Sequence, residues 1–142
     1  MKNLILLFAF LLITGCASHS APVQSADPVP VDDIFEGYHE YSQRKDGAVR
    51  VIVARDEGPA VGGTWMPVKL SINGVAVAEF RRSQRLELFM KPGDYIVALQ
   101  GYPLIENLVT QTDVHIKSGE QYAFGITYNV GDFLFKQSTP PQ

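Results

Sequence analysis

From Ala48 onward, short runs of alternating apolar and polar residues follow one another, separated by turn-forming residues. A period of two places alternate side chains on opposite faces of an extended strand, so each run predicts a β-strand with one buried face. The runs cover residues 49–55, 67–72, 75–80, 85–90, 95–100, 111–116, 121–128 and 133–137. Short strands without a convincing long helix favour a single all-β domain over residues 48–138, an antiparallel β-sandwich or barrel of about seven to eight strands.

Two turns between these runs carry a clear signal. Asn73 and Gly74 separate "PVKLSI" from "VAVAEF", and both residue types tolerate the positive φ of a type I′ turn, so a β-hairpin is expected there. Pro92 and Gly93 lie in "KPGD" and predict a tight turn into the next strand. Apolar inner faces on two such sheets can form one core without disulfides or metals.

The N-terminus has the features of a targeting segment. Lys2 precedes ten apolar residues at positions 4–13, which as a helix span only about half of a ~30 Å hydrocarbon core. This pattern is typical of a secretory signal peptide, here residues 1–15. At its end, Ile13-Thr14-Gly15-Cys16 resembles the lipobox of bacterial lipoproteins.

The lipobox resemblance implies that Cys16 carries lipid. In such proteins the thiol receives a diacylglycerol, the signal peptide is cut before the cysteine, and the new amino group is usually acylated. Two or three acyl chains anchor a protein stably to a membrane. In enterobacterial lipoproteins, an aspartate directly after the lipidated cysteine resembles a signal for retention in the inner membrane. This chain has Ala17 there, which favours the outer membrane, facing the periplasm. Cys16 is the only cysteine, so a disulfide within the chain is excluded.

Cleavage before Cys16 would leave 127 residues with 11 basic and 15 acidic side chains, a net charge of about −4. This balance argues against a nucleic-acid partner bound through phosphates. Residues 16–30 are small, polar and proline-rich, and we expect a flexible tether. Residues 31–47 favour a short helical or irregular segment, and residues 139–142 a tail.

Motifs of catalysis or metal binding are hard to find in this chain. The serines lack the surroundings of a nucleophile elbow, and the single cysteine is assigned to lipid. His115 alternates with apolar neighbours in a predicted strand, which favours an ordinary surface position. Glu36, His39 and Glu40 have helical spacing, but one imidazole makes a poor zinc site. We therefore expect no enzyme activity, no cofactor and no metal.

Two surface features remain as candidate binding sites. Trp65 and Met66 lie in the long connection 55–67, and tryptophan is frequent in binding hot spots, although a lone tryptophan plugging one end of the sandwich is the favoured interpretation. Arg81 and Arg82, with Arg85, form a basic run before a strand. This run is suited to lipid headgroups or an acidic partner, but a solvated hairpin end is favoured.

The middle of the chain resembles a family of small bacterial lipoproteins described only as domains of unknown function. The resemblance rests on "VIVARDEGPAVGG", "VKLSINGVAVAEF" and "RLELFMKPGDYIVAL", with Arg55-Asp56, Ile72-Asn73-Gly74 and Pro92-Gly93 matching the family pattern. It implies an immunoglobulin-like or transthyretin-like sandwich and no known activity. Many members carry a cysteine in the loop where this chain has Trp65, so a role of that cysteine does not transfer.

Two functional hypotheses follow. In the first, a membrane-anchored, non-catalytic module binds another component of the cell envelope, such as a protein of a secretion or assembly apparatus. In the second, the domain binds a ligand or inhibits an enzyme through the Trp65 loop, and its negative charge attracts a basic enzyme such as a wall hydrolase.

Overall fold

The computed structural model of the chain describes residues 25–58, 65–101, 109–129 and 132–138. The predicted signal peptide, Cys16, most of the predicted tether and the tail 139–142 lie outside the described residues. Within these ranges, no helix has the length and apolar character needed to cross a membrane.

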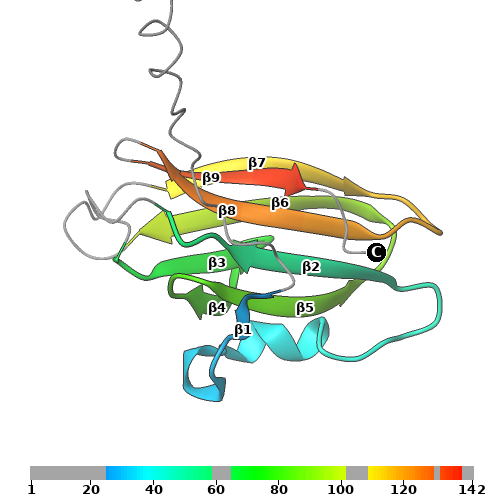
Figure 1. Cartoon of the computed structure of the whole chain (residues 1–142). Coiled ribbons are helices and arrows are strands. Elements are labelled where there is room, and N and C mark those ends of the chain that lie inside the picture. Colours follow the sequence, from blue (N-terminus) through cyan, green and yellow to red (C-terminus); the bar gives the residue numbers. More distant parts are fainter. Residues whose placement is uncertain (1–24, 59–64, 102–108, 130–131, 139–142) are drawn as a thin grey trace, which may run out of the picture.

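Two packed β-sheets make up the described part of the chain (Figure 1). One sheet has five strands in the order β1-β5-β2-β8-β9, and the other has four in the order β4-β3-β6-β7. The strands are β1 Asp27–Pro28, β2 Val49–Arg55, β3 Val68–Ile72, β4 Val75–Phe80, β5 Gln84–Met90, β6 Gly93–Gly101, β7 Val109–Ile116, β8 Tyr122–Asn129 and β9 Asp132–Ser138. The expected all-β architecture is confirmed.

The alternation in the sequence reappears as alternating burial along the strands. In β3, Val68, Leu70 and Ile72 are at most 1% exposed and face the opposite sheet. The hairpin after β3 is also confirmed, because Asn73 has φ 50° and Gly74 has φ 81°, both in the region that a type I′ turn requires. The eight predicted strands therefore follow from period and turn chemistry together.

The sheet order corrects one part of the expectation, because the five-stranded sheet is mixed rather than antiparallel. β2 pairs in parallel with β8, and β1 pairs in parallel with β5. Six connections separate β2 from β8, and each reverses the chain direction, so the two strands run the same way. A parallel pair needs a long connection, which here passes twice through the opposite sheet.

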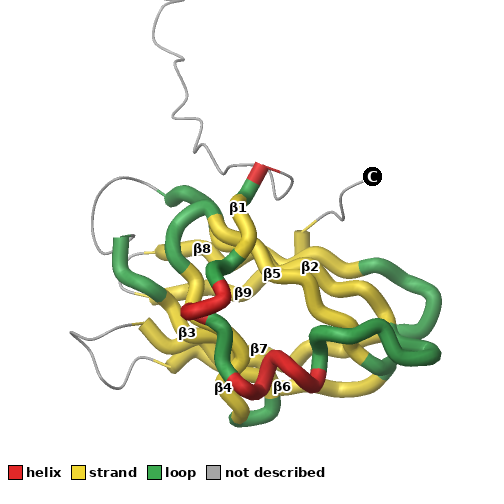
Figure 2. Tube along the Cα trace, turned by 90° about the horizontal axis from the view of Figure 1, so that it is seen from below, coloured by secondary structure: helices red, strands yellow, loops and turns green. Residues whose placement is uncertain are grey.

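The predicted boundary of the tether at residue 30 lies too far along the chain. Residues 26–41, which we call the strap, cross the open side between the two sheets (Figure 2). Ala26 and Val29 are each 6% exposed, because backbone pairing to β5 lets these small side chains pack on the sheet. The strap continues through two short 3₁₀ helices, η2 Val31–Asp33 and η3 Glu36–Glu40.

Backbone hydrogen bonds fasten the strap to both sheets. On the five-stranded sheet, Val29 N donates to Arg85 O at 3.0 Å, and Phe89 N donates to Tyr41 O at 2.8 Å. On the four-stranded sheet, Phe35 N donates to Val77 O at 2.9 Å. The strap therefore covers exposed strand edges that would otherwise leave backbone groups unpaired.

Tyr41, at the end of the strap, predicts how stability depends on alkaline pH. Its ring is 6% exposed and contacts Tyr95 edge to face, with ring centroids 6.5 Å apart. Burial, followed by the nearby charge of Glu40, raises the pKa of Tyr41 from 10.0 to about 12. The Tyr41 hydroxyl therefore ionises more easily in the unfolded chain than in the folded protein. The contribution of the protonated side chain to the free energy of unfolding is complete below pH 10 and is lost as pH rises toward 12.

We expect Tyr41→Phe to remove part of this alkaline loss. A shift of this size corresponds to at most about 2 to 3 kcal/mol between pH 10 and 12. The measurement is urea unfolding of both proteins from pH 8 upward. Unfolding curves that weaken in parallel for the two proteins across this window would contradict the assignment to Tyr41.

Candidate functional site

Two of the surface features singled out in the sequence lie at the same end of the sandwich. At this end β2, β4, β6 and β8 finish, and β3, β5, β7 and β9 begin (left in Figure 1). Trp65 and Met66 lead into β3, whereas Arg81 and Arg82 follow β4. We call this rim the Trp65 end; its described residues are 31–33, 56–58, 65–67, 81–83, 109 and 132.

The side chain of Trp65 is not a core plug, and that interpretation is wrong. Trp65 is 68% exposed, and Met66 beside it is half-buried. The interior at this end is instead filled by Phe80, which is fully buried, by Phe133, which is 2% exposed, and by Arg55. The indole is therefore available at the surface.

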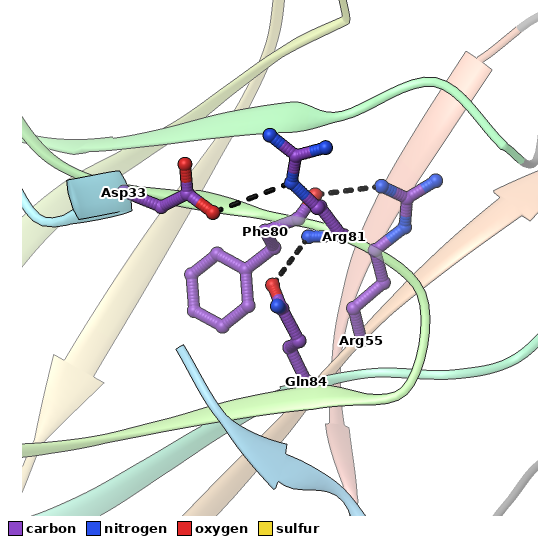
Figure 3. A network of polar contacts seen from close by, with 5 residues as sticks. All are labelled: Asp33, Arg55, Phe80, Arg81 and Gln84. Carbon is purple, nitrogen blue, oxygen red and sulfur yellow. Dashed lines mark hydrogen bonds and ion pairs between the residues drawn. The ribbon is translucent and has the colours of Figure 1, made fainter. Parts of the chain in front are cut away.

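Arg55 is a buried cation that closes the sandwich at the Trp65 end. It is 3% exposed, its Nη1 donates to the carbonyl oxygen of Phe80 at 2.7 Å, and its guanidinium lies 5.1 Å from the ring centroid of Phe133 (Figure 3). Burial lowers its pKa to about 10, although Asp56 counteracts this effect. The sequence already contained the signal, because Arg55 continues the inward face of Val51 and Val53.

Arg81 and Arg82, in the β4–β5 turn, each contact an acidic residue of another segment. Arg81 Nε donates to Asp33 Oδ2 at 3.3 Å, and its backbone N donates to Gln84 Oε1 at 2.6 Å (Figure 3). Arg82 Nε donates to the backbone oxygen of Glu57 at 2.6 Å, and its Nη2 lies 3.8 Å from the Glu57 carboxylate. Through these hydrogen bonds and ion pairs, the predicted basic run links the β4–β5 turn to η2 and to the residues that follow β2.

Asp56 is a partly buried acid at this end. Burial raises its pKa, and the positive charges of Arg55 and Arg82 counteract the shift. Its backbone N donates to Ile126 O at 3.2 Å, which holds the residue at the end of β2. This hydrogen bond attaches the residue after β2 to the neighbouring strand β8.

Arg85 lies one residue into β5 and faces outward from the five-stranded sheet, so the structure does not unite all five predicted surface residues on one surface. It is exposed on the outer face of the five-stranded sheet, in a cleft of about 330 Å³ beneath the strap. Tyr38 and Ile52 line the cleft, as does an ion pair in which Arg50 Nη2 lies 2.7 Å from Glu87 Oε2. No pattern in the sequence indicates this cleft, because the strap that covers it lacks periodicity.

The two histidines among the described residues, His39 and His115, lie apart from the Trp65 end. His115 is exposed, as predicted, and its Nδ1 lies 2.6 Å from Asp94 Oδ1 on the neighbouring strand. Glu36, His39 and Glu40 are exposed on η3. In the part of the chain that the structure describes, no group of three or more His, Cys, Asp or Glu side chains has a geometry suited to a metal ion.

Comparisons of the chain with models of protein families, with curated proteins and with solved structures find no match. The resemblance to small bacterial lipoproteins of unknown function therefore stays a prediction.

Proposed function

We propose that the protein is a lipid-anchored, non-catalytic module of the bacterial cell envelope, held at the outer membrane and facing the periplasm. Its sandwich binds another component of the envelope, such as part of a secretion or assembly apparatus, through the Trp65 end. The fold is an immunoglobulin-like or transthyretin-like sandwich. Two packed sheets with inward-facing apolar residues on alternate positions support this finer assignment.

The exposure of Trp65 is the observation that carries this proposal. A tryptophan that is 68% exposed leaves a large apolar ring in water, and such rings are frequent in the centres of binding surfaces. At the same end, Arg82 donates to the backbone oxygen of Glu57, which attaches the residues that follow β2 to the β4–β5 turn.

The lipid anchor is tested by Cys16→Ser. Because the thiol is the proposed site of acylation, the variant should lose all labelling by a fatty-acid analogue and keep its signal peptide. Metabolic labelling followed by gel electrophoresis measures both effects, and Ser18→Ala serves as a control that keeps the thiol. Normal labelling and processing of Cys16→Ser would reject the anchor.

The binding surface is tested by crosslinking in intact cells. A photoreactive amino acid at the exposed position Glu57 reports on the Trp65 end while Trp65 itself stays in place. The same amino acid at Lys91, in the exposed turn at the opposite end, is the matched control. A reproducible adduct from position 57 that is absent from position 91 supports the proposal, whereas identical patterns from both positions contradict it.

The exposed indole also favours a second function, the binding of a ligand or the inhibition of an enzyme such as a wall hydrolase. Trp65 is the only tryptophan in the chain, so its fluorescence reports directly on that contact. Inhibition of a hydrolase together with a change in Trp65 emission would support this function. Unchanged activity and unchanged emission on mixing would reject it.

A further inference from the structure

The chain enters the sandwich at the Trp65 end. Strand β1 lies beside the first residues of β5, where Asp27 N donates to Ser83 O at 2.8 Å and Pro28 pairs with Arg85. Ser25 follows Cys16 by nine residues, which span at most about 30 Å when fully extended. The opposite end lies farther from Ser25 by the length of a strand, roughly 25 to 30 Å. A lipid on Cys16 therefore keeps the Trp65 end nearer to the bilayer.

Three of the five large apolar side chains that are exposed among the described residues lie at the same end. They are Val31, 80% exposed, Trp65, 68%, and Val109, 46%, whereas Val75 and Ile96, at 52% and 48%, lie beside the Asn73-Gly74 hairpin at the opposite end. Val31 belongs to η2, Trp65 to the turn before β3 and Val109 to the start of β7, so three separate segments each present an apolar side chain there. Tryptophan prefers the membrane interface, where the ring contacts acyl chains and its N–H stays hydrated.

The charges at this end indicate how it meets a lipid surface. Arg81 and Arg82 each contact a carboxylate, at 3.3 Å to Asp33 and 3.8 Å to Glu57, so their charges are largely balanced. Attraction by anionic headgroups is therefore weak, and the apolar side chains provide the contact. Contact of this kind depends little on salt, because screening acts on exposed charges.

We infer that the Trp65 end rests on the surface of the bilayer that holds the lipid anchor, with the Trp65 ring at the depth of the headgroups. The inference rests on the proposed function and names the envelope component that this end meets. The two sheets then stand away from the membrane, and the hairpin at Asn73-Gly74 points away from it. Because this end carries five carboxylates against Arg81 and Arg82, zwitterionic lipid suits the contact better than anionic lipid.

The single tryptophan provides the experiment. The full-length protein, processed and lipidated in cells, is reconstituted into zwitterionic vesicles that contain lipids brominated near the headgroup end of the acyl chain. We expect Trp65 emission to shift to shorter wavelengths and to lose much of its intensity, equally at low and high salt. The matched control is Trp65→Phe combined with Lys91→Trp, which moves the tryptophan to an exposed turn at the opposite end and should leave it unquenched.

Flotation of the vesicles separates failure of the inference from failure of the anchor. Protein that does not float with the vesicles contradicts the lipid anchor, and the inference with it. Protein that floats, but whose Trp65 is quenched no more than the tryptophan at position 91, overturns the inference and leaves the anchor intact. If Trp65 stays unquenched and position 57 crosslinks to an envelope protein in cells, the Trp65 end belongs to a protein partner instead.

Discussion

Replacing Arg55 by alanine is expected to lower the free energy of unfolding by about 2 to 4 kcal/mol, with a fall in Tm of roughly 10 °C. The truncation leaves the buried carbonyl oxygen of Phe80 without the donor 2.7 Å away, at a cost of about 1 to 3 kcal/mol. It also removes the packing of the guanidinium over Phe133 and leaves a cavity. Relief from burying a charge, evident in the lowered pKa of Arg55, offsets part of this loss.

Arg50→Ala is the matched control, because Arg50 lies on the same strand and also contacts an oxygen at 2.7 Å. Its side chain is 46% exposed, and an exposed ion pair contributes less than about 1 kcal/mol. Urea unfolding at pH 7 measures both variants. Arg55→Met, which keeps most of the apolar stem, should fall between them. Equal losses for Arg55→Ala and Arg50→Ala would show that Arg55 does not hold this end of the sandwich together.

The strands were predictable because their signal is local. β2 and β4 begin and end at the residues expected, since alternation and the flanking turns both depend on neighbours in sequence. The strap was not predictable in the same way. Asp27–Pro28 is too short to show alternation, and its attachment to β5 depends on backbone groups rather than on side-chain pattern. The parallel pairing of β2 with β8 likewise depends on the path of the whole chain.

The candidate site was predictable only in its position along the chain. Turn residues in the sequence indicated that Trp65 and Arg82 lie in connections between strands. The order of the strands in the two sheets places both connections at the Trp65 end, which no local pattern indicates. The exposure of Trp65 depends on what else fills the end of the core, which is Arg55 and Phe133. The partners Asp33 and Glu57 lie 48 and 25 positions from the arginines that they bind, so no local pattern indicates them.

Gly37→Ala is expected to lower the free energy of unfolding by about 2 to 3 kcal/mol. Gly37 lies in η3, where the strap comes closest to β4. A Cβ at this position would lie 2.3 Å from the backbone oxygen of Ala76 and 2.7 Å from Val75 Cγ1. The first contact is with backbone, so it cannot be relieved by a side-chain rotation, and η3 must move away from β4.

Gly125→Ala in β8 is the matched control, since its nearest neighbour would be the backbone oxygen of Lys136 at 3.9 Å, an ordinary contact. It should change stability by less than about 0.5 kcal/mol. Urea unfolding of the two variants gives the comparison, and equal stability losses would contradict the close approach of Gly37 to β4.

Hydrogen exchange distinguishes local detachment of the strap from a uniform loss of stability. The amide of Phe35 donates to Val77 O at 2.9 Å, and the amide of Phe89 donates to Tyr41 O at 2.8 Å, so both depend on the strap. Amides of the central strand β2 do not. If the strap opens as a unit of its own, Gly37→Ala should accelerate exchange at Phe35 and Phe89 far more than in β2. Equal acceleration at all three places would mean that strap and sheets unfold together, and that the strap belongs to the cooperative core.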